Sequence, residues 1–138
     1  MSTPYENADL LMRLYEFRRE AKLRDARNWV IRSFNPNSPE DYTAALASEN
    51  SAKLRMVISY WDMAAAFVVH GAIAAPMFHA TSGEMLATFC KIEHMLEEVR
   101  EHTGQGNLLS HVEEVAAEWP GATERMAGLR EYLATLSE

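Results

Sequence analysis

The chain has 138 residues, of which 48% are hydrophobic and 24% are charged, and its net charge is −7 at pH 7. This length suits one domain, and the composition excludes a disordered or fibrous protein. The acidic excess provides no generic attraction to nucleic acid or anionic lipid, so we expect no nucleic-acid partner. Residues 1–138 are therefore predicted to form a single domain.

Cysteine content and hydropathy bear on the compartment. The single cysteine, Cys90, leaves no intrachain disulfide and is typical of a reducing compartment. The N-terminal segment lacks the basic and apolar regions of a secretory signal. The longest apolar run, residues 63–78, is interrupted by His70 and Pro76 and is shorter than the ~20 residues of a membrane span. We expect a cytoplasmic protein without a membrane span.

The first part of the chain predicts a long helix and then a short one. Residues 2–34 begin with a Ser-Thr-Pro start signal and continue with apolar side chains at helical spacing. Two prolines in the segment 35–39 break the chain, and Ser38 is placed to cap a helix through Leu46. We expect a kink or a short turn at residues 48–51.

The middle of the chain predicts the core of the fold. The stretch from Lys53 to Gly71 is apolar almost all round, which is typical of a helix in the middle of a bundle. Gly71 is expected to end this helix, and Pro76 to start another that runs to about Arg100. That second helix carries a stripe at alternating steps of four and three, the spacing of knobs-into-holes packing. The stripe consists of Phe78, Ser82, Met85, Phe89, Ile92, Leu96 and Val99.

Two more helices are predicted beyond this stripe. Asn107 is placed to cap a short helix through Ala116, and a Pro-Gly pair at 120–121 separates it from a last helix that ends near Leu136. Short connections favour antiparallel neighbours. The predicted fold class is therefore all-α: a mostly antiparallel bundle of about five helices around a central apolar helix.

Polar side chains on the apolar central helix are the main candidates for a ligand site. Arg55, Asp62 and His70 recur along one edge of that helix, and His79 is placed to approach them at one end of the bundle. Buried charges need partners, so pairing within the fold explains this stripe and is the interpretation we favour. The alternative is a small-ligand pocket formed by these four side chains.

No spacing in the sequence indicates a particular reaction, metal or cofactor. His94 with Glu97, and His111 with Glu114, reverse the order of the Glu-x-x-His motif of helical di-iron proteins. Cys90 has no neighbouring base that would activate its thiol, which fits a small buried residue. We therefore expect no metal and no cofactor, and the sequence favours a non-enzymatic protein.

Charge is distributed unevenly along the chain. The predicted first helix holds seven of the 13 basic residues, although acidic residues are interleaved with them. The segment 84–138 holds 11 of the 20 acidic residues. These two parts are expected to attract each other, either within one bundle or between subunits.

The central third of the chain carries a pattern of aromatic, acidic and glycine residues. It consists of Tyr60-Trp61-Asp62-Met63-Ala64-Ala65, then His70-Gly71-Ala72-Ile73, then Phe89, Ile92 and Arg100. This pattern resembles that of an uncharacterised bacterial all-helical family, a domain of unknown function. The resemblance implies an all-helical fold and brings no known activity, cofactor or catalytic residue.

These observations favour a protein that acts by association. We expect a homo-oligomer or a protein partner bound through a face such as Trp119 or the aromatic side chains of the first helix. The alternative is a small-ligand binder or sensor with a bundle cavity near Asp62, His70 and His79.

Overall fold

A computed structural model describes residues 3–136, and this part of the chain is helical without any strand. The helices are α1 (Pro4–Arg19), α2 (Ala21–Arg32), α3 (Pro39–Leu46), α4 (Ser51–Val69), α5 (Ala75–Thr81), α6 (Glu84–Cys90), α7 (Leu96–Thr103), α8 (Ser110–Ala117) and α9 (Ala122–Leu136). A 3₁₀ turn, Glu93–Met95, joins α6 to α7. The all-α class is confirmed, and the expected number of about five helices is wrong.

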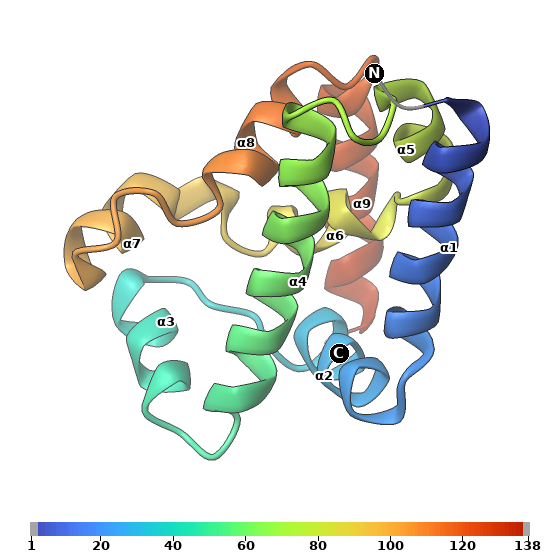
Figure 1. The fold of residues 1–138 in the computed structure, drawn as a ribbon. Coiled ribbons are helices and arrows are strands. Elements are labelled where there is room, and N and C mark those ends of the chain that lie inside the picture. Colours follow the sequence, from blue (N-terminus) through green and yellow to red (C-terminus); the bar gives the residue numbers. More distant parts are fainter. Residues whose placement is uncertain (1–2, 137–138) are drawn as a thin grey trace.

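Helix α4 is the centre of the arrangement (Figure 1). Helices α1 and α9 run in the direction opposite to α4, while α2 crosses near one end of α4. Both α2 and α8 pack directly on α4, and α3 contacts α4 and α7 on the other side. The fully buried side chains of Leu54, Val57 and Trp61 place the middle of α4 in the core. Among the described helices, none combines the length and the apolar character needed to cross a membrane.

The helix expected over residues 2–34 is divided into α1 and α2 at Glu20. The backbone of Glu20 is extended, with ψ of 137°, and its carboxylate accepts a hydrogen bond of 2.9 Å from the Leu23 N–H. Glu20 thus ends one helix and caps the next, a role more often taken by Ser, Thr, Asp or Asn. The start of α1 is as predicted, with Thr3 as its cap; Ser2 lies outside the described residues.

The helix expected from Pro76 to Arg100 is also interrupted. It forms α5, α6, the 3₁₀ turn and α7, with breaks around Gly83 and Ile92. All seven stripe positions are nevertheless buried. The stripe correctly predicts burial, but burial does not require one straight helix, because short helices that change direction bury the same side chains against different neighbours.

Other boundaries follow the predicted signals. A turn separates α3 from α4 at residues 47–50, and α4 ends before Gly71, whose φ of +82° is favourable for glycine. A proline occupies the first turn of α5. Helix α8 departs from expectation: it begins at Ser110, after a left-handed Leu109, and not directly after Asn107.

Candidate functional site

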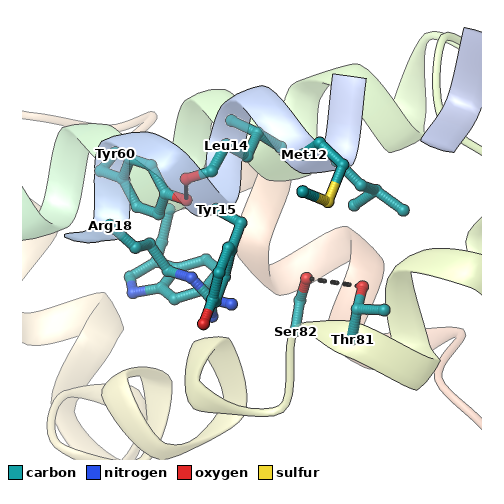
Figure 2. Close-up of a pocket in the computed structure, with 9 residues that line it drawn as sticks. Met12, Leu14, Tyr15, Arg18, Tyr60, Thr81 and Ser82 are labelled. Carbon is teal, nitrogen blue, oxygen red and sulfur yellow. Dashed lines mark hydrogen bonds between the residues drawn. The ribbon is translucent and has the colours of Figure 1, made fainter. Parts of the chain in front are cut away.

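A groove of about 370 Å³ lies between α1, α4 and the end of α5 (Figure 2). We call it the α1 groove. Its lining residues are Leu11, Met12, Leu14, Tyr15, Arg18, Tyr60, Trp61, Thr81 and Ser82. Figure 2 shows Tyr15 and Arg18 extending from α1, with Thr81 and Ser82 across from them. Most of this lining is apolar, so the groove suits an apolar group flanked by a few polar contacts.

A buried hydrogen bond fixes α1 on α4 beside this groove. The Tyr60 hydroxyl donates to the carbonyl oxygen of Leu14 at 2.6 Å. Burial raises the pKa of Tyr60 to about 12, so the phenol is a neutral donor at physiological pH. The Tyr60 ring also meets the Trp61 ring edge to face, with centroids 4.9 Å apart. The floor of the groove is therefore rigidly attached to the core.

Arg18 supplies the positive charge of the groove. Its guanidinium carbon lies 5.3 Å from the centroid of the Tyr15 ring and 5.5 Å from that of the Trp61 ring, both within cation–π range. The Arg18 carbonyl accepts a hydrogen bond of 2.7 Å from Arg27, which also pairs with Glu84 at 2.9 Å. This network connects α1 to α2 and α6, and so holds the basic end of the groove in place.

Large hydrophobic side chains are exposed mainly on α1. Of the six such side chains in the described part of the chain, α1 carries Tyr5, Met12, Tyr15 and Phe17, with exposed fractions from 43% to 90%. Met12 and Tyr15 form the rim of the groove. Tyr5 lies seven residues before Met12 and therefore on the same helix face, whereas Phe17 lies on a different face. One face of α1 thus presents a row of apolar side chains leading to the groove.

Asp62, a predicted site residue, caps helix α8 from α4. Its Oδ1 accepts hydrogen bonds from the backbone N–H groups of His111, at 3.0 Å, and Val112, at 3.1 Å. Its Oδ2 lies 2.8 Å from Nδ1 of the His111 ring. Leu109, which precedes α8, has φ of 55° and no side-chain acceptor. The carboxylate therefore satisfies helix-end donors that no local residue satisfies.

The predicted histidines lie at the same end of the bundle but make separate contacts. His70 is exposed, and its ring centroid is 5.9 Å from that of His111, the partner of Asp62. His79 stacks on Trp119 with ring centroids 4.4 Å apart, and burial lowers the pKa of His79. The structure therefore brings Asp62 and His70 to a common neighbour, His111, while His79 belongs to an aromatic cluster.

Arg55, the fourth predicted residue, contacts none of the other three. Its side chain is exposed, and its Nε donates to the Ser51 hydroxyl at 3.3 Å. Seven residues separate Arg55 from Asp62, which is about 10 Å along a helix axis. A cavity of about 130 Å³ near the histidines is lined by His79, Glu114 and Glu118, among others, but by neither Arg55 nor Asp62.

Trp119 is not an exposed docking residue, and this expectation is wrong. Only 6% of its surface is exposed. It packs edge to face on Phe78 and stacks on His79, while the Arg125 guanidinium lies 5.6 Å from its ring centroid. The aromatic side chains on α1, Tyr5, Tyr15 and Phe17, are by contrast exposed as expected. The other two in the predicted first helix are not, because Trp29 is half-buried and Phe34 is buried.

Within residues 3–136, no three His, Cys, Asp or Glu side chains converge on a point that a metal ion would occupy. The α1 groove itself was missed by the sequence analysis. Its residues come from α1, α4 and α5, and only the packing of these helices creates the concavity. The one signal in the sequence was the set of aromatic side chains on the first helix.

The fold and the groove define an all-helical domain with a candidate binding surface on its first helix. Residues 5–119 match the family described as Domain of unknown function (DUF4760). The chain belongs to this family, and every described residue that lines the α1 groove lies within the match, whereas α9 lies beyond it. No curated protein matches the chain, and no solved structure matches it either.

Proposed function

We propose that this domain is a non-enzymatic binding module that associates with a protein through the α1 groove, and first of all with a second copy of itself. The observation that carries this proposal is the row of exposed apolar side chains on α1 beside an apolar groove. Contiguous exposed apolar surface is uncommon on monomers and is characteristic of interaction sites. An apolar side chain from the partner would fill the groove as an anchor.

The rim of the groove favours a protein over a small molecule. Met12, Tyr15 and Arg18 surround the opening, and Met, Tyr and Arg are the residue types enriched at protein interfaces. Tyr15 and Arg18 also stack on each other, which reduces the side-chain entropy lost on binding. The groove therefore has a central apolar depression with a partly ordered polar edge, as interfaces have.

Charge distribution favours a second copy as the partner. Residues 1–34 contain seven basic and five acidic residues, whereas residues 84–138 contain four basic and 11 acidic residues. Surfaces of opposite charge steer two copies toward contact between unlike regions. A contact of this kind is heterologous, and it produces a closed ring when its rotation closes.

Sedimentation or light scattering over a range of concentrations tests the proposal. The wild-type mass is expected to rise from 15.6 kDa toward a multiple of it. Tyr15→Ser combined with Met12→Ser is expected to abolish this rise, because both substitutions remove apolar surface at the rim. Phe17→Ser is the matched control, because Phe17 is an equally exposed α1 residue that does not line the groove.

Two results would contradict the proposal. A mass of 15.6 kDa at every concentration would exclude self-association. An equal loss of association in Phe17→Ser would exclude the groove as the site, since that substitution leaves the groove lining intact.

A small ligand beside His79 is the second candidate. The cavity of about 130 Å³ is lined by His79, Glu114 and Glu118, among others, and these side chains can accept hydrogen bonds from a small ligand. Native mass spectrometry of the untagged protein tests it: an excess mass of a small molecule, lost in His79→Ala, is expected if the cavity is a binding site.

We also propose a cytoplasmic location. The support is Cys90, the only cysteine, which is buried and free. Burial raises the pKa of its thiol, so it behaves as a small core residue that needs no disulfide partner.

A further inference from the structure

A second cleft, of about 300 Å³, lies where the end of α6, the C-terminal half of α9 and the segment between α2 and α3 meet. We call it the Lys91 cleft. Lys91, His94 and Arg130 line it together with the amide side chains of Asn35 and Asn37. Among the described residues, none that lines the cleft is acidic. The cleft therefore concentrates cationic groups and side-chain amides in a chain whose net charge is −7.

Lys91 is a buried ammonium without a buried counter-charge. Only 6% of its surface is exposed, and its Nζ donates to Oδ1 of Asn35 at 2.7 Å. Within residues 3–136 it forms no ion pair. A neutral amide oxygen compensates a buried charge only in part, and burial accordingly lowers the pKa of Lys91. An ammonium has three donors, so this contact leaves two of them for a ligand.

Arg130 provides a second cation on the α9 side of the cleft. One guanidinium nitrogen, Nη2, lies 3.2 Å from the Glu93 carboxylate. The guanidinium has five N–H donors, and this single contact leaves most of them available. Planar guanidinium groups bind phosphate and carboxylate groups through paired hydrogen bonds.

We propose that the Lys91 cleft binds a small-molecule oxyanion, a phosphate or carboxylate group, between the Lys91 ammonium and the Arg130 guanidinium, with His94 beside it. A bound anion supplies the counter-charge that buried Lys91 lacks. It also accepts the Arg130 donors that Glu93 leaves unused. The cleft is far larger than a single anionic group, so the rest of the ligand fits along Leu133.

Glu93 provides a test of the proposal, because its negative charge disfavours binding of an anion next to Arg130. Its carboxylate competes with the oxyanion for Arg130 and repels it electrostatically. Removal of this negative charge by Glu93→Gln is therefore expected to tighten binding. Removal of the positive charge by Arg130→Gln is expected to weaken it. Both side chains are more than one-third exposed, so neither substitution threatens the core.

The test is a titration of isotope-labelled protein with inorganic phosphate at constant ionic strength, monitored by the backbone amide resonances of Asn35, Asn37 and residues 91–94. Saturable shifts at these amides are expected in the wild-type protein. Arg130→Gln is expected to weaken binding about tenfold, the effect of one lost charged hydrogen bond, and Glu93→Gln to strengthen it several-fold. Arg125→Gln is the matched control, because it removes the same charge from α9 outside the cleft.

Several outcomes would overturn the proposal. These are the absence of saturable shifts at the cleft, an equal weakening by Arg125→Gln, or no tightening by Glu93→Gln. A parallel titration with succinate identifies the source: binding of phosphate alone indicates a phosphorylated ligand, and binding of both indicates recognition of the shared oxyanion.

Discussion

Replacement of Asp62 by alanine is expected to release helix α8 from α4. The substitution removes the acceptor of two backbone N–H groups, at His111 and Val112, and of the His111 ring. Loss of a helix cap costs about 1–2 kcal/mol, and a hydrogen bond to a charged group contributes about 1.5–3 kcal/mol. Because 24% of the Asp62 side chain is exposed, water replaces part of the loss. We expect a decrease of about 2–3 kcal/mol in the free energy of unfolding.

Urea unfolding measures this decrease, and thermal unfolding is expected to shift by about 3–5 °C per kcal/mol in a domain of this size. Asp9→Ala is the matched control: Asp9 is a helical aspartate whose ion pair with Arg13 is solvent-exposed, so its loss is expected to cost less than about 1 kcal/mol. Hydrogen exchange locates the effect, because the amides of His111 and Val112 are expected to lose protection first. Equal stability of the Asp62 and Asp9 variants, or unchanged protection at α8, would refute the capping role.

Three further predictions concern buried or half-buried polar groups. Arg100→Ala is expected to cost about 2–3 kcal/mol in urea unfolding, because the guanidinium donates twice to the Leu108 carbonyl, at 2.8 and 3.0 Å; Arg100→Lys, which lacks the planar fork, should restore only part of this. Burial lowers the pKa of His79 below its ordinary value of 6.5, so on acidification His79 is protonated in the unfolded chain before it is protonated in the folded chain. The free energy of unfolding is therefore expected to fall as the pH drops through 6.5. His79→Phe keeps the stacked ring and is expected to show a smaller loss between about pH 7.5 and 5; an unchanged loss would contradict burial of the imidazole. Burial raises the pKa values of Tyr42 and Tyr60 to about 12, so an absorbance titration of the wild type is expected to show a late phenolate component that shrinks in each Phe variant.

The stripe from Phe78 to Val99 shows which features of this fold can be predicted from the sequence. Periodic apolar residues report burial, and all stripe positions are buried. Periodic apolar residues do not show whether they belong to one continuous helix. The helix can be interrupted at Gly83 because the side chains before and after the interruption remain in the core. The same reasoning applies to Glu20, whose high helix propensity was overridden by its capping contact with Leu23.

The candidate sites, too, were only partly predictable from the sequence. The need of Asp62 for a partner follows from its place on an apolar helix, but the partner, His111, lies 49 residues away and is set by the packing of α8 on α4. The aromatic side chains of the first helix were expected to form a binding face, and those on α1 are exposed. The depth of the groove could not be predicted from the sequence, since it depends on how α5 approaches α1.

The two proposed sites differ in how much of each lies within the part of the chain that matches the family. The described residues that line the α1 groove all lie within residues 5–119, whereas the Lys91 cleft requires Arg130 from beyond that match. Helix α2 contacts both α1 and α9, and its Arg27 holds the Arg18 carbonyl beside the groove. If α2 keeps the same position when either site is altered, Arg130→Gln should weaken anion binding with unchanged association, and Tyr15→Ser combined with Met12→Ser should show the reverse. Loss of both properties in either variant would instead mean that α2 couples the two sites.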